Sequence, residues 1–140
     1  GKSQKKILNY LTFNNYNKGY EFENEWLSKN PDNISIYNDD ELCGFIFTTN
    51  GFINLYKLLK KAFEPKLYKV KNKELKIFLM AGSDDPVIQS EKHLKKLEIF
   101  LNNVGYKNTQ IKLYEDLRHE ILNEKNYGQI YKDVLEFIMN

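Results

Sequence analysis

The arrangement of apolar residues in the second half of the chain constrains the fold more than any other feature. Residues 75–81 form a short apolar run that ends at Gly82, which is typical of a buried strand. Residues 110–114 predict a second strand, and residues 126–139 predict a final helix. An amphipathic segment lies between the two strands. The order strand, helix, strand, helix predicts a βαβα unit, and therefore an α/β fold with parallel strands.

Helical spacing also indicates which faces of these two helices pack inward. The first helix is expected to begin after Ser90 and to end at Gly105, a residue that favours helix C-termini. Its apolar residues recur three or four positions apart, at Leu94, Leu97, Leu101 and Val104. In the last helix, we expect the inward face to contain Ile130, Val134, Leu135 and Ile138.

The first half of the chain is rich in aromatic residues and less regular. Residues 14–19 and 29–33 are rich in Asn and other turn-forming residues, so they predict turns rather than regular structure. Residues 51–63 predict a helix, with Thr49 and Asn50 as candidate N-caps. The chain therefore divides into two parts near residue 73.

Composition excludes several classes of protein. The chain has 140 residues, a single domain's length, and 41% are hydrophobic, enough for a core. The 21 basic and 19 acidic residues are too balanced for a dedicated nucleic-acid binder. One cysteine, Cys43, and two histidines exclude a disulfide framework and disfavour a metal site, and we expect no cofactor. The sequence shows no bilayer-spanning run and no signal-peptide pattern, so we expect a cytoplasmic protein.

The two predicted strands bring acidic residues and a histidine to one edge of the sheet. Because both strands of a βαβ unit run the same way, the loops that follow them leave the sheet at its carboxyl edge. The first loop contains Asp84 and Asp85, and the second contains His119. An Asp–His pair here makes two-thirds of a hydrolase triad, in which the carboxylate orients the imidazole and the imidazole takes a proton from a nucleophile. From spacing alone, a structural or surface pair remains the alternative.

The residues around this pair resemble a known family. Residues 82–87 read G-S-D-D-P-V, and residues 114–124 read Y-E-D-L-R-H-E-I-L-N-E. These closely resemble the acid and histidine motifs of α/β-hydrolases of the monoacylglycerol lipase and lysophospholipase type. The resemblance implies that Asp85 is the triad acid and His119 the triad base, with Asp84 at a variable position. Arg118 and Glu120 flank the histidine, and we expect them to support its loop through a carboxylate pair.

The first half of the chain resembles the cap region of the same family. Residues 25–29 read E-W-L-S-K and residues 37–45 read Y-N-D-D-E-L-C-G-F. The chain departs from the family pattern at four positions, which are Lys29, Glu41, Asp116 and Leu117. The resemblance implies a mostly helical cap segment over residues 1–72, followed by the C-terminal βαβα part of an α/β-hydrolase core over residues 73–140. It also implies a substrate pocket lined by Trp26, Phe45, Phe47 and Phe52, with ordinary core packing as the alternative.

The chain lacks a recognisable nucleophile. The triad order in this fold is Ser, Asp, His, with the serine in an upstream G-x-S-x-G turn. None of the five serines has these flanking glycines: Ser3, Ser28, Ser35, Ser83 and Ser90. By resemblance, the chain is the C-terminal half of the fold. We therefore expect no ester hydrolysis unaided and infer that the missing N-terminal half, from the same gene product or a separate chain, supplies the serine.

Three hypotheses follow. The first is a C-terminal fragment of a serine ester hydrolase that acts on lysophospholipids or monoacylglycerols. The second is a non-catalytic binding or assembly module derived from half a hydrolase, and the third is an unrelated βαβ domain. Two parallel strands alone make a poor sheet. We therefore expect the chain to cover the open edge by forming homo-oligomers, by swapping elements, or by recruiting residues 5–11 as a substitute strand.

Overall fold

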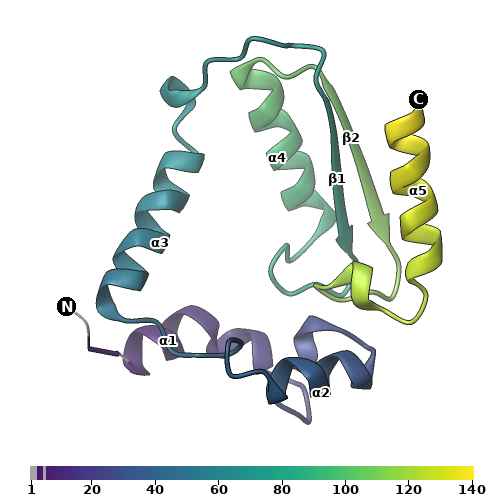
Figure 1. The fold of residues 1–140 in the computed structure, drawn as a ribbon. Coiled ribbons are helices and arrows are strands. Elements are labelled where there is room, and N and C mark those ends of the chain that lie inside the picture. Colours follow the sequence, from purple (N-terminus) through teal and green to yellow (C-terminus); the bar gives the residue numbers. More distant parts are fainter. Residues whose placement is uncertain (1–2, 5) are drawn as a thin grey trace.

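A computed structural model describes residues 3–4 and 6–140, and it has the predicted α/β architecture. Five helices and two strands follow one another along the chain (Figure 1): α1 (Lys6–Phe13), α2 (Pro31–Asp39), α3 (Thr49–Ala62), β1 (Lys76–Gly82), α4 (Glu91–Val104), β2 (Asn108–Tyr114) and α5 (Tyr127–Met139). Short 3₁₀ turns lie between them: η1 (Asn14–Asn17), η2 (Glu25–Leu27), η3 (Pro65–Leu67) and η4 (Ile121–Asn123). None of the described helices is long and apolar enough to cross a membrane.

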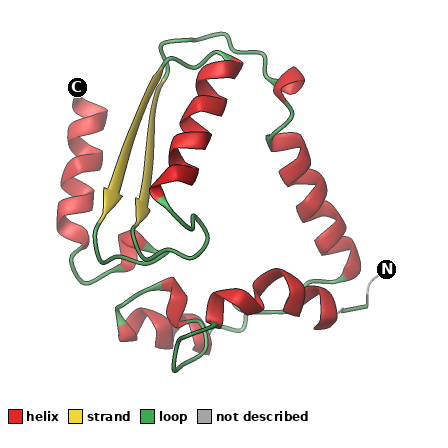
Figure 2. Cartoon of the chain, turned by 180° about the vertical axis from the view of Figure 1, so that it is seen from behind, coloured by secondary structure: helices red, strands yellow, loops and turns green. Residues whose placement is uncertain are grey.

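The second half of the chain folds as the predicted βαβα unit, residues 76–139. Strands β1 and β2 pair in parallel, with Lys76 opposite Asn108 at one end and Gly82 opposite Tyr114 at the other. Figure 2 shows both arrows ending at the same edge of the sheet. Helix α4 lies on one side of the strands and α5 on the other (Figure 1). Both loops that carry the candidate site residues therefore leave the sheet at one edge.

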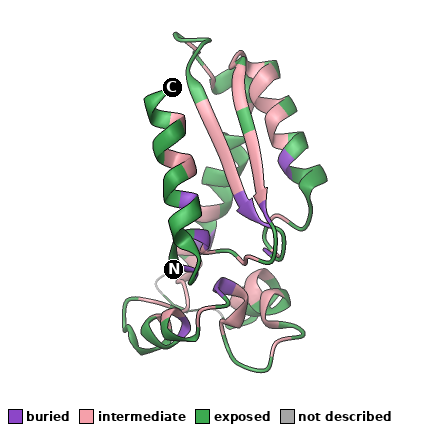
Figure 3. Cartoon of the chain, turned by 90° about the vertical axis from the view of Figure 1, so that its right-hand side faces the viewer, coloured by how far each residue is buried: buried purple, intermediate pink, exposed green. Residues whose placement is uncertain are grey.

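The core of this unit gathers near that edge. Tyr114, Ile121 and Ile130 form a buried cluster against which Met80 and Leu117 pack. Figure 3 shows that buried positions on the strands lie at their carboxyl ends. Side chains alternate along a strand, so Phe78 and Met80 of β1 point to the same face of the sheet. That face is covered by α5, because Phe78 stacks on Phe137 with 5.0 Å between the ring centroids. The buried residues of both strands thus lie next to the candidate site.

Helix α5 corrects one prediction about its inward face. Ile130 is 1% exposed, as expected, but Leu135 and Ile138 are 59% and 70% exposed. The prediction that these two residues face inward is wrong. Helix α5 packs on a sheet of only two strands, so one flank of its apolar stripe has no strand beneath it.

The sheet also keeps open edges. Among the described residues, β1 pairs only with β2. Only Ala81 and Gly82 of β1 are buried, although the sequence predicts a buried strand. The missing burial agrees with an α/β sheet that lacks its further strands.

The N-terminal region, residues 6–67, differs from the predictions at three points. Residues 6–11 belong to helix α1 rather than to a substitute strand; Lys5 lies outside the described residues. The spacing of Ile7, Leu8 and Leu11 suits one face of a helix and not an alternating strand.

The other two differences concern how helices begin. The predicted turn at residues 29–33 contains the start of α2, because Pro31 occupies the first turn and the Asn30 side chain accepts a hydrogen bond from the Asp32 amide. Helix α3 is capped by Thr48, whose side chain accepts from the Gly51 amide, and not by Thr49 or Asn50. At α4, Ser90 occupies the cap position, but its hydroxyl bonds the His93 ring instead of a backbone amide.

Candidate active site

The loops that follow β1 and β2 are joined through their backbones. The Ser83 amide donates to the Tyr114 carbonyl at 2.8 Å, and the Asp84 amide donates to the Leu117 carbonyl at 2.9 Å. Gly82 makes this approach possible, because a Cβ at this position would lie 2.1 Å from the Leu117 carbonyl oxygen. The glycine that ends the first strand therefore lets the acid loop and the histidine loop touch.

Asp85 and His119 meet directly in this arrangement. One carboxylate oxygen of Asp85 lies 2.9 Å from Nδ1 of His119, and the other accepts a hydrogen bond from the Val87 amide at 2.8 Å. Asp85 is 5% exposed, whereas the His119 side chain is 40% exposed. Because a carboxylate only accepts hydrogen bonds, Nδ1 of a neutral His119 carries the proton. That tautomer leaves Nε2 with its lone pair.

The Asp85 carboxylate also shifts the protonation equilibrium of the histidine. The hydrogen bond to Asp85 raises the pKa of His119, although partial burial of the ring acts in the opposite direction. This is the electrostatic arrangement that stabilises an imidazolium once the ring has taken a proton. The pair therefore has the geometry and the charge of the acid–base part of a hydrolase triad.

Asp84 makes a different set of contacts. Its carboxylate pairs with the Lys29 ammonium at 2.7 Å and accepts a hydrogen bond from the Ser83 hydroxyl at 2.9 Å. These contacts, the Lys29 hydrogen bond foremost, lower the pKa of Asp84. Lys29 also lies 3.6 Å from Asp116. Asp84 thus connects the N-terminal region to the acid loop and does not contact His119.

Arg118 and Glu120 fix the backbone on both sides of His119. Nη1 of Arg118 donates to the carbonyls of Glu25 at 2.6 Å and Ser28 at 3.1 Å, and it lies 3.5 Å from the Glu25 carboxylate. The Glu120 amide donates to the Leu27 carbonyl at 2.7 Å. Arg118 therefore contacts a carboxylate, as expected, but most of its hydrogen bonds go to backbone carbonyls.

Sequence reasoning missed a further acidic residue, Glu124. It is 2% exposed, and its carboxylate accepts hydrogen bonds from the Ser28 hydroxyl and the amides of Lys29 and Arg118. Glu124 is the last residue of the histidine segment, and Ser28 lies in the E-W-L-S-K segment. Both residues therefore stand in segments that resemble the family's motifs, but only the fold shows that these two segments touch.

The four aromatic residues predicted to line a pocket belong to one chain of contacting rings. Trp26 lies at the end next to His119, and Phe45, Phe47 and Phe52 lie at the other end. The Trp26 ring lies 5.3 Å from the His119 ring and 5.0 Å from Tyr16. Tyr16 contacts Phe13 at 6.4 Å, and Phe13 contacts both Phe47 at 6.2 Å and Phe52 at 6.3 Å.

The far end of this series is part core and part surface. Phe45 is exposed and contacts Phe47 at 5.3 Å. Phe52 is 1% exposed, so it packs beneath the others and offers no surface of its own. The rings thus form a partly exposed apolar path from Phe45 to the candidate catalytic histidine.

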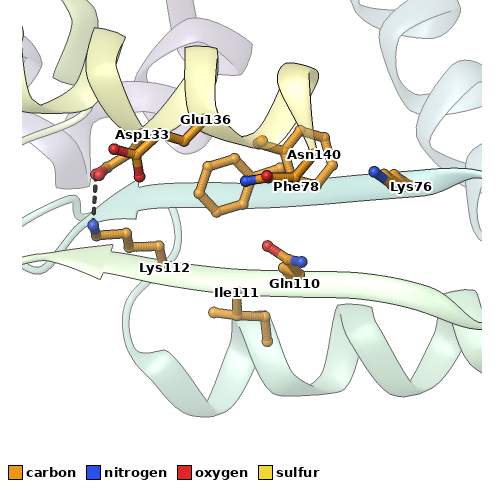
Figure 4. A pocket seen from close by; sticks show the side chains of 9 residues that line it. Lys76, Phe78, Gln110, Ile111, Lys112, Asp133, Glu136 and Asn140 are labelled. Atoms are coloured by element: carbon orange, nitrogen blue, oxygen red, sulfur yellow. Dashed lines mark ion pairs between the residues drawn. The ribbon is translucent and has the colours of Figure 1, made fainter.

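A cavity of about 280 Å³ lies elsewhere, between α5 and the sheet. Figure 4 shows Phe78 beside it and the ion pair between Lys112 and Asp133 at one end. The residues that line it include neither Asp85 nor His119. This cavity is separate from the candidate site. No cluster of His, Cys, Asp and Glu within residues 3–4 and 6–140 suits a metal ion.

Comparison with known proteins identifies the family. A family model described as serine aminopeptidase, S33, matches residues 4–126. The chain belongs to this S33 hydrolase family. Among solved structures, a lipase in an open form matches 97% of the chain with a TM-score of 0.79 at 21% identity. A carboxyl esterase from Bacillus coagulans matches 99% with a TM-score of 0.71 at 22% identity.

A monoacylglycerol lipase from Paleococcus ferrophilus matches 98% of the S33 chain, with a TM-score of 0.63 at 16% identity. The chain covers 45%, 47% and 53% of these three structures. No curated protein matches it significantly. The structure is thus part of an α/β-hydrolase fold, and the chain spans about half the length of the structures it resembles.

Proposed function

We propose that this chain supplies the acid and the base of a serine carboxylic-ester hydrolase, with the nucleophile carried by a segment outside the chain. The observation that carries the proposal is the 2.9 Å contact between buried Asp85 and Nδ1 of the half-exposed His119. The family membership of the chain supports it. So does the sequence, in which no serine stands in a G-x-S-x-G turn.

In the complete enzyme, Nε2 of His119 takes the proton of the serine hydroxyl as its oxygen attacks the ester carbonyl. Asp85 orients the ring and stabilises the imidazolium. His119 then returns the proton to the leaving alcohol, which leaves an acyl-serine. Water hydrolyses that acyl group with His119 again acting as the base. The N-terminal half also has to supply the donors of the oxyanion hole.

The aromatic path favours a lipid ester as the substrate. Its rings lead from His119 through Trp26 to Phe47 and the exposed Phe45, and partly exposed aromatic surface suits an acyl chain better than a charged group. We therefore propose lysophospholipids or monoacylglycerols as the substrate class.

The unpaired edge of β1 supports a proposal about partners. In the complete enzyme, a strand of the N-terminal half pairs with this edge. In its absence, we expect two or more copies of the chain to associate through it, because an exposed strand edge readily pairs with another chain. Light scattering across a range of concentrations tests this. A monomer at every concentration would contradict it.

A complementation assay tests the catalytic role. The purified chain is mixed with the N-terminal half of a family hydrolase that contains a G-x-S-x-G turn, and hydrolysis of p-nitrophenyl butyrate is measured. We expect no activity from either piece alone and activity from the mixture. His119→Ala should abolish it. His93→Ala is the matched control, because that histidine is exposed on α4 and its ring bonds the Ser90 hydroxyl rather than a residue of the candidate site.

Two outcomes would overturn the proposal. One is ester hydrolysis by the 140-residue chain alone, which would require a nucleophile that we have dismissed. The other is full activity of the complemented His119→Ala variant.

A further inference from the structure

Residues 25–29 of the N-terminal region run against the histidine loop, and Glu124 lies at the centre of this contact. One oxygen of its carboxylate accepts from the Lys29 amide at 3.0 Å and from the Arg118 amide at 3.1 Å. The other accepts from the Ser28 hydroxyl at 2.9 Å and from the Lys29 amide at 2.9 Å. A buried carboxylate thus joins two segments about 90 residues apart in sequence.

The same two segments meet again on either side of His119. The Arg118 guanidinium donates to the carbonyls of Glu25 and Ser28, and the Glu120 amide donates to the Leu27 carbonyl. On the side of the acid loop, the Asp84 amide donates to the Leu117 carbonyl. Hydrogen bonds therefore fix the backbone around His119 at Leu117, Arg118 and Glu120. The position of this backbone sets the direction of the imidazole.

We infer that Glu124 is a positioning residue for His119, which it holds toward Asp85 by fixing Arg118 to residues 28–29. The catalytic meaning of this inference rests on the proposed function. The hydrogen bonds of Glu124 do not depend on that proposal. Glu124 does not touch the imidazole and takes no proton in the reaction. Its role is to make the orientation of the catalytic base depend on contact with the N-terminal region.

The chemistry of the Glu124 site requires a carboxylate in particular. Three groups point hydrogens at it: the Ser28 hydroxyl and the amides of Lys29 and Arg118. A glutamine has one acceptor oxygen and an NH₂ group. If the NH₂ takes the place of the oxygen beside the Arg118 amide, two N–H groups face each other, and a buried donor without an acceptor is destabilising. If it takes the other place, the Ser28 hydroxyl has to accept from the NH₂, and its own hydrogen loses the carboxylate as acceptor. Glu124→Gln therefore loosens the contact without changing the size of the side chain.

The test follows the ring nitrogens of His119 in the isolated 140-residue chain by ¹⁵N NMR across a pH titration. In the wild type, we expect the Nδ1–H tautomer and a pKa above the ordinary value, because of the bond to Asp85. In Glu124→Gln, the pKa should fall toward the ordinary value and the Nε2–H tautomer should grow. Glu115→Gln is the matched control, because it removes the same charge from an exposed position in the same loop.

A second variant keeps the test decisive if Glu124→Gln does not fold. Ser28→Ala removes one donor to the carboxylate and the acceptor of the Asn30 amide, but it leaves the carboxylate with both backbone amides. It should therefore shift the His119 signals in the same direction by a smaller amount. Circular dichroism of each variant checks the fold. In the complementation assay, Glu124→Gln should lower kcat on the order of 10- to 100-fold with KM little changed, as expected for misplacement of a catalytic group.

The inference fails if Glu124→Gln and Ser28→Ala fold and give the same His119 pKa and tautomer as Glu115→Gln. This failure differs from failure of the proposed function. The NMR readouts need no ester hydrolysis, and loss of the catalytic proposal would appear as an active His119→Ala variant.

Discussion

The N-terminal region and the βαβα unit bury apolar side chains in different ways. The βαβα unit places two helices on opposite sides of one parallel strand pair (Figure 1), and its buried apolar side chains come from β1, α4, β2, η4 and α5. In the N-terminal region, the buried apolar residues are Leu27, Ile34 and Phe52. Helices α1 and α3 leave large apolar side chains exposed, including Leu11 at 70% and Leu58 at 65%.

The two regions also attach to each other in two chemically distinct places. At one, Phe63 of the N-terminal region packs on Phe100 of α4 at 5.5 Å between ring centroids, and Tyr68, just after that region, packs on the same ring at 5.5 Å. At the other, hydrogen bonds and ion pairs connect residues 25–33 to the loops around Asp85 and His119. The comparison teaches that the βαβα unit forms the scaffold of the candidate site, whereas the N-terminal region contacts the site around His119, through polar groups and the Trp26 ring.

The largest expected effect would come from the acid of the pair. In the complemented enzyme, Asp85→Asn should lower kcat/KM about 10³- to 10⁴-fold, because the asparagine favours the wrong tautomer of His119. Trp26→Ala, which removes the ring that the N-terminal region packs against His119, should lower kcat/KM far less. Rates on p-nitrophenyl butyrate measure both. An equal loss of kcat/KM in the two variants would show that the two regions do not differ in their contribution to the site.

A second prediction concerns the backbone contact that joins the loops carrying Asp85 and His119. Gly82→Ala should lower the free energy of unfolding by about 4 kcal/mol or more, because the new Cβ meets the Leu117 carbonyl, which no side-chain rotation relieves. Gly128→Ala in α5 is the control. Nothing lies within 4 Å of a Cβ there, and alanine should stabilise the helix by about 0.5–1 kcal/mol. Urea denaturation measures both changes.

The two cores give a direct test of how independent the regions are. Phe52→Ala should destabilise the N-terminal region by about 3–5 kcal/mol, and Ile130→Ala should destabilise the βαβα unit by about 2–5 kcal/mol. If the regions unfold separately, hydrogen exchange in Phe52→Ala should quicken in α1 and α3 but stay slow in β1 and β2. Uniform acceleration across the chain would show a single cooperative unit instead.

A smaller effect is expected from the ion pair that ties α5 to β2. Hydrogen bonds from Lys112, Tyr114 and Gln129 lower the pKa of Asp133 to about 2. Since this value lies below that of an unfolded aspartate, about 3.9, the stabilisation is present above pH 4 and is lost as the pH falls through 2. Asp133→Asn should therefore lower Tm at pH 7 and leave it unchanged near pH 2. An equal loss at both values would show that packing, not charge, is responsible.

The smallest expected effect is the pH dependence from His119. Because its pKa is raised in the folded chain, its contribution to stability is fully present below about pH 6.5 and is lost as the pH rises through the folded value. Thermal unfolding between pH 5 and 9 should show this slope in the wild type and a weaker one in Asp85→Asn. The same slope in both would remove Asp85 as its cause.

Much of the βαβα unit followed from the sequence because its signals are local. The apolar runs located both strands to within two residues, and helical spacing with Gly105 located α4. The meeting of Asp85 and His119 also followed, since parallel strands bring successive loops to one edge. The exposure of Leu135 and Ile138 on α5 did not follow, because their burial depends on how many strands lie beneath the helix.

The sequence by itself determined the strand and helix order, the α/β class and the sheet edge that carries an Asp and a His. Tertiary structure alone decided that residues 25–29 contact the histidine loop and that Glu124 is buried between them. The reason is physical. Local periodicity fixes which residues share a face of one element, but burial and hydrogen bonding between segments 90 residues apart exist only once the chain has folded.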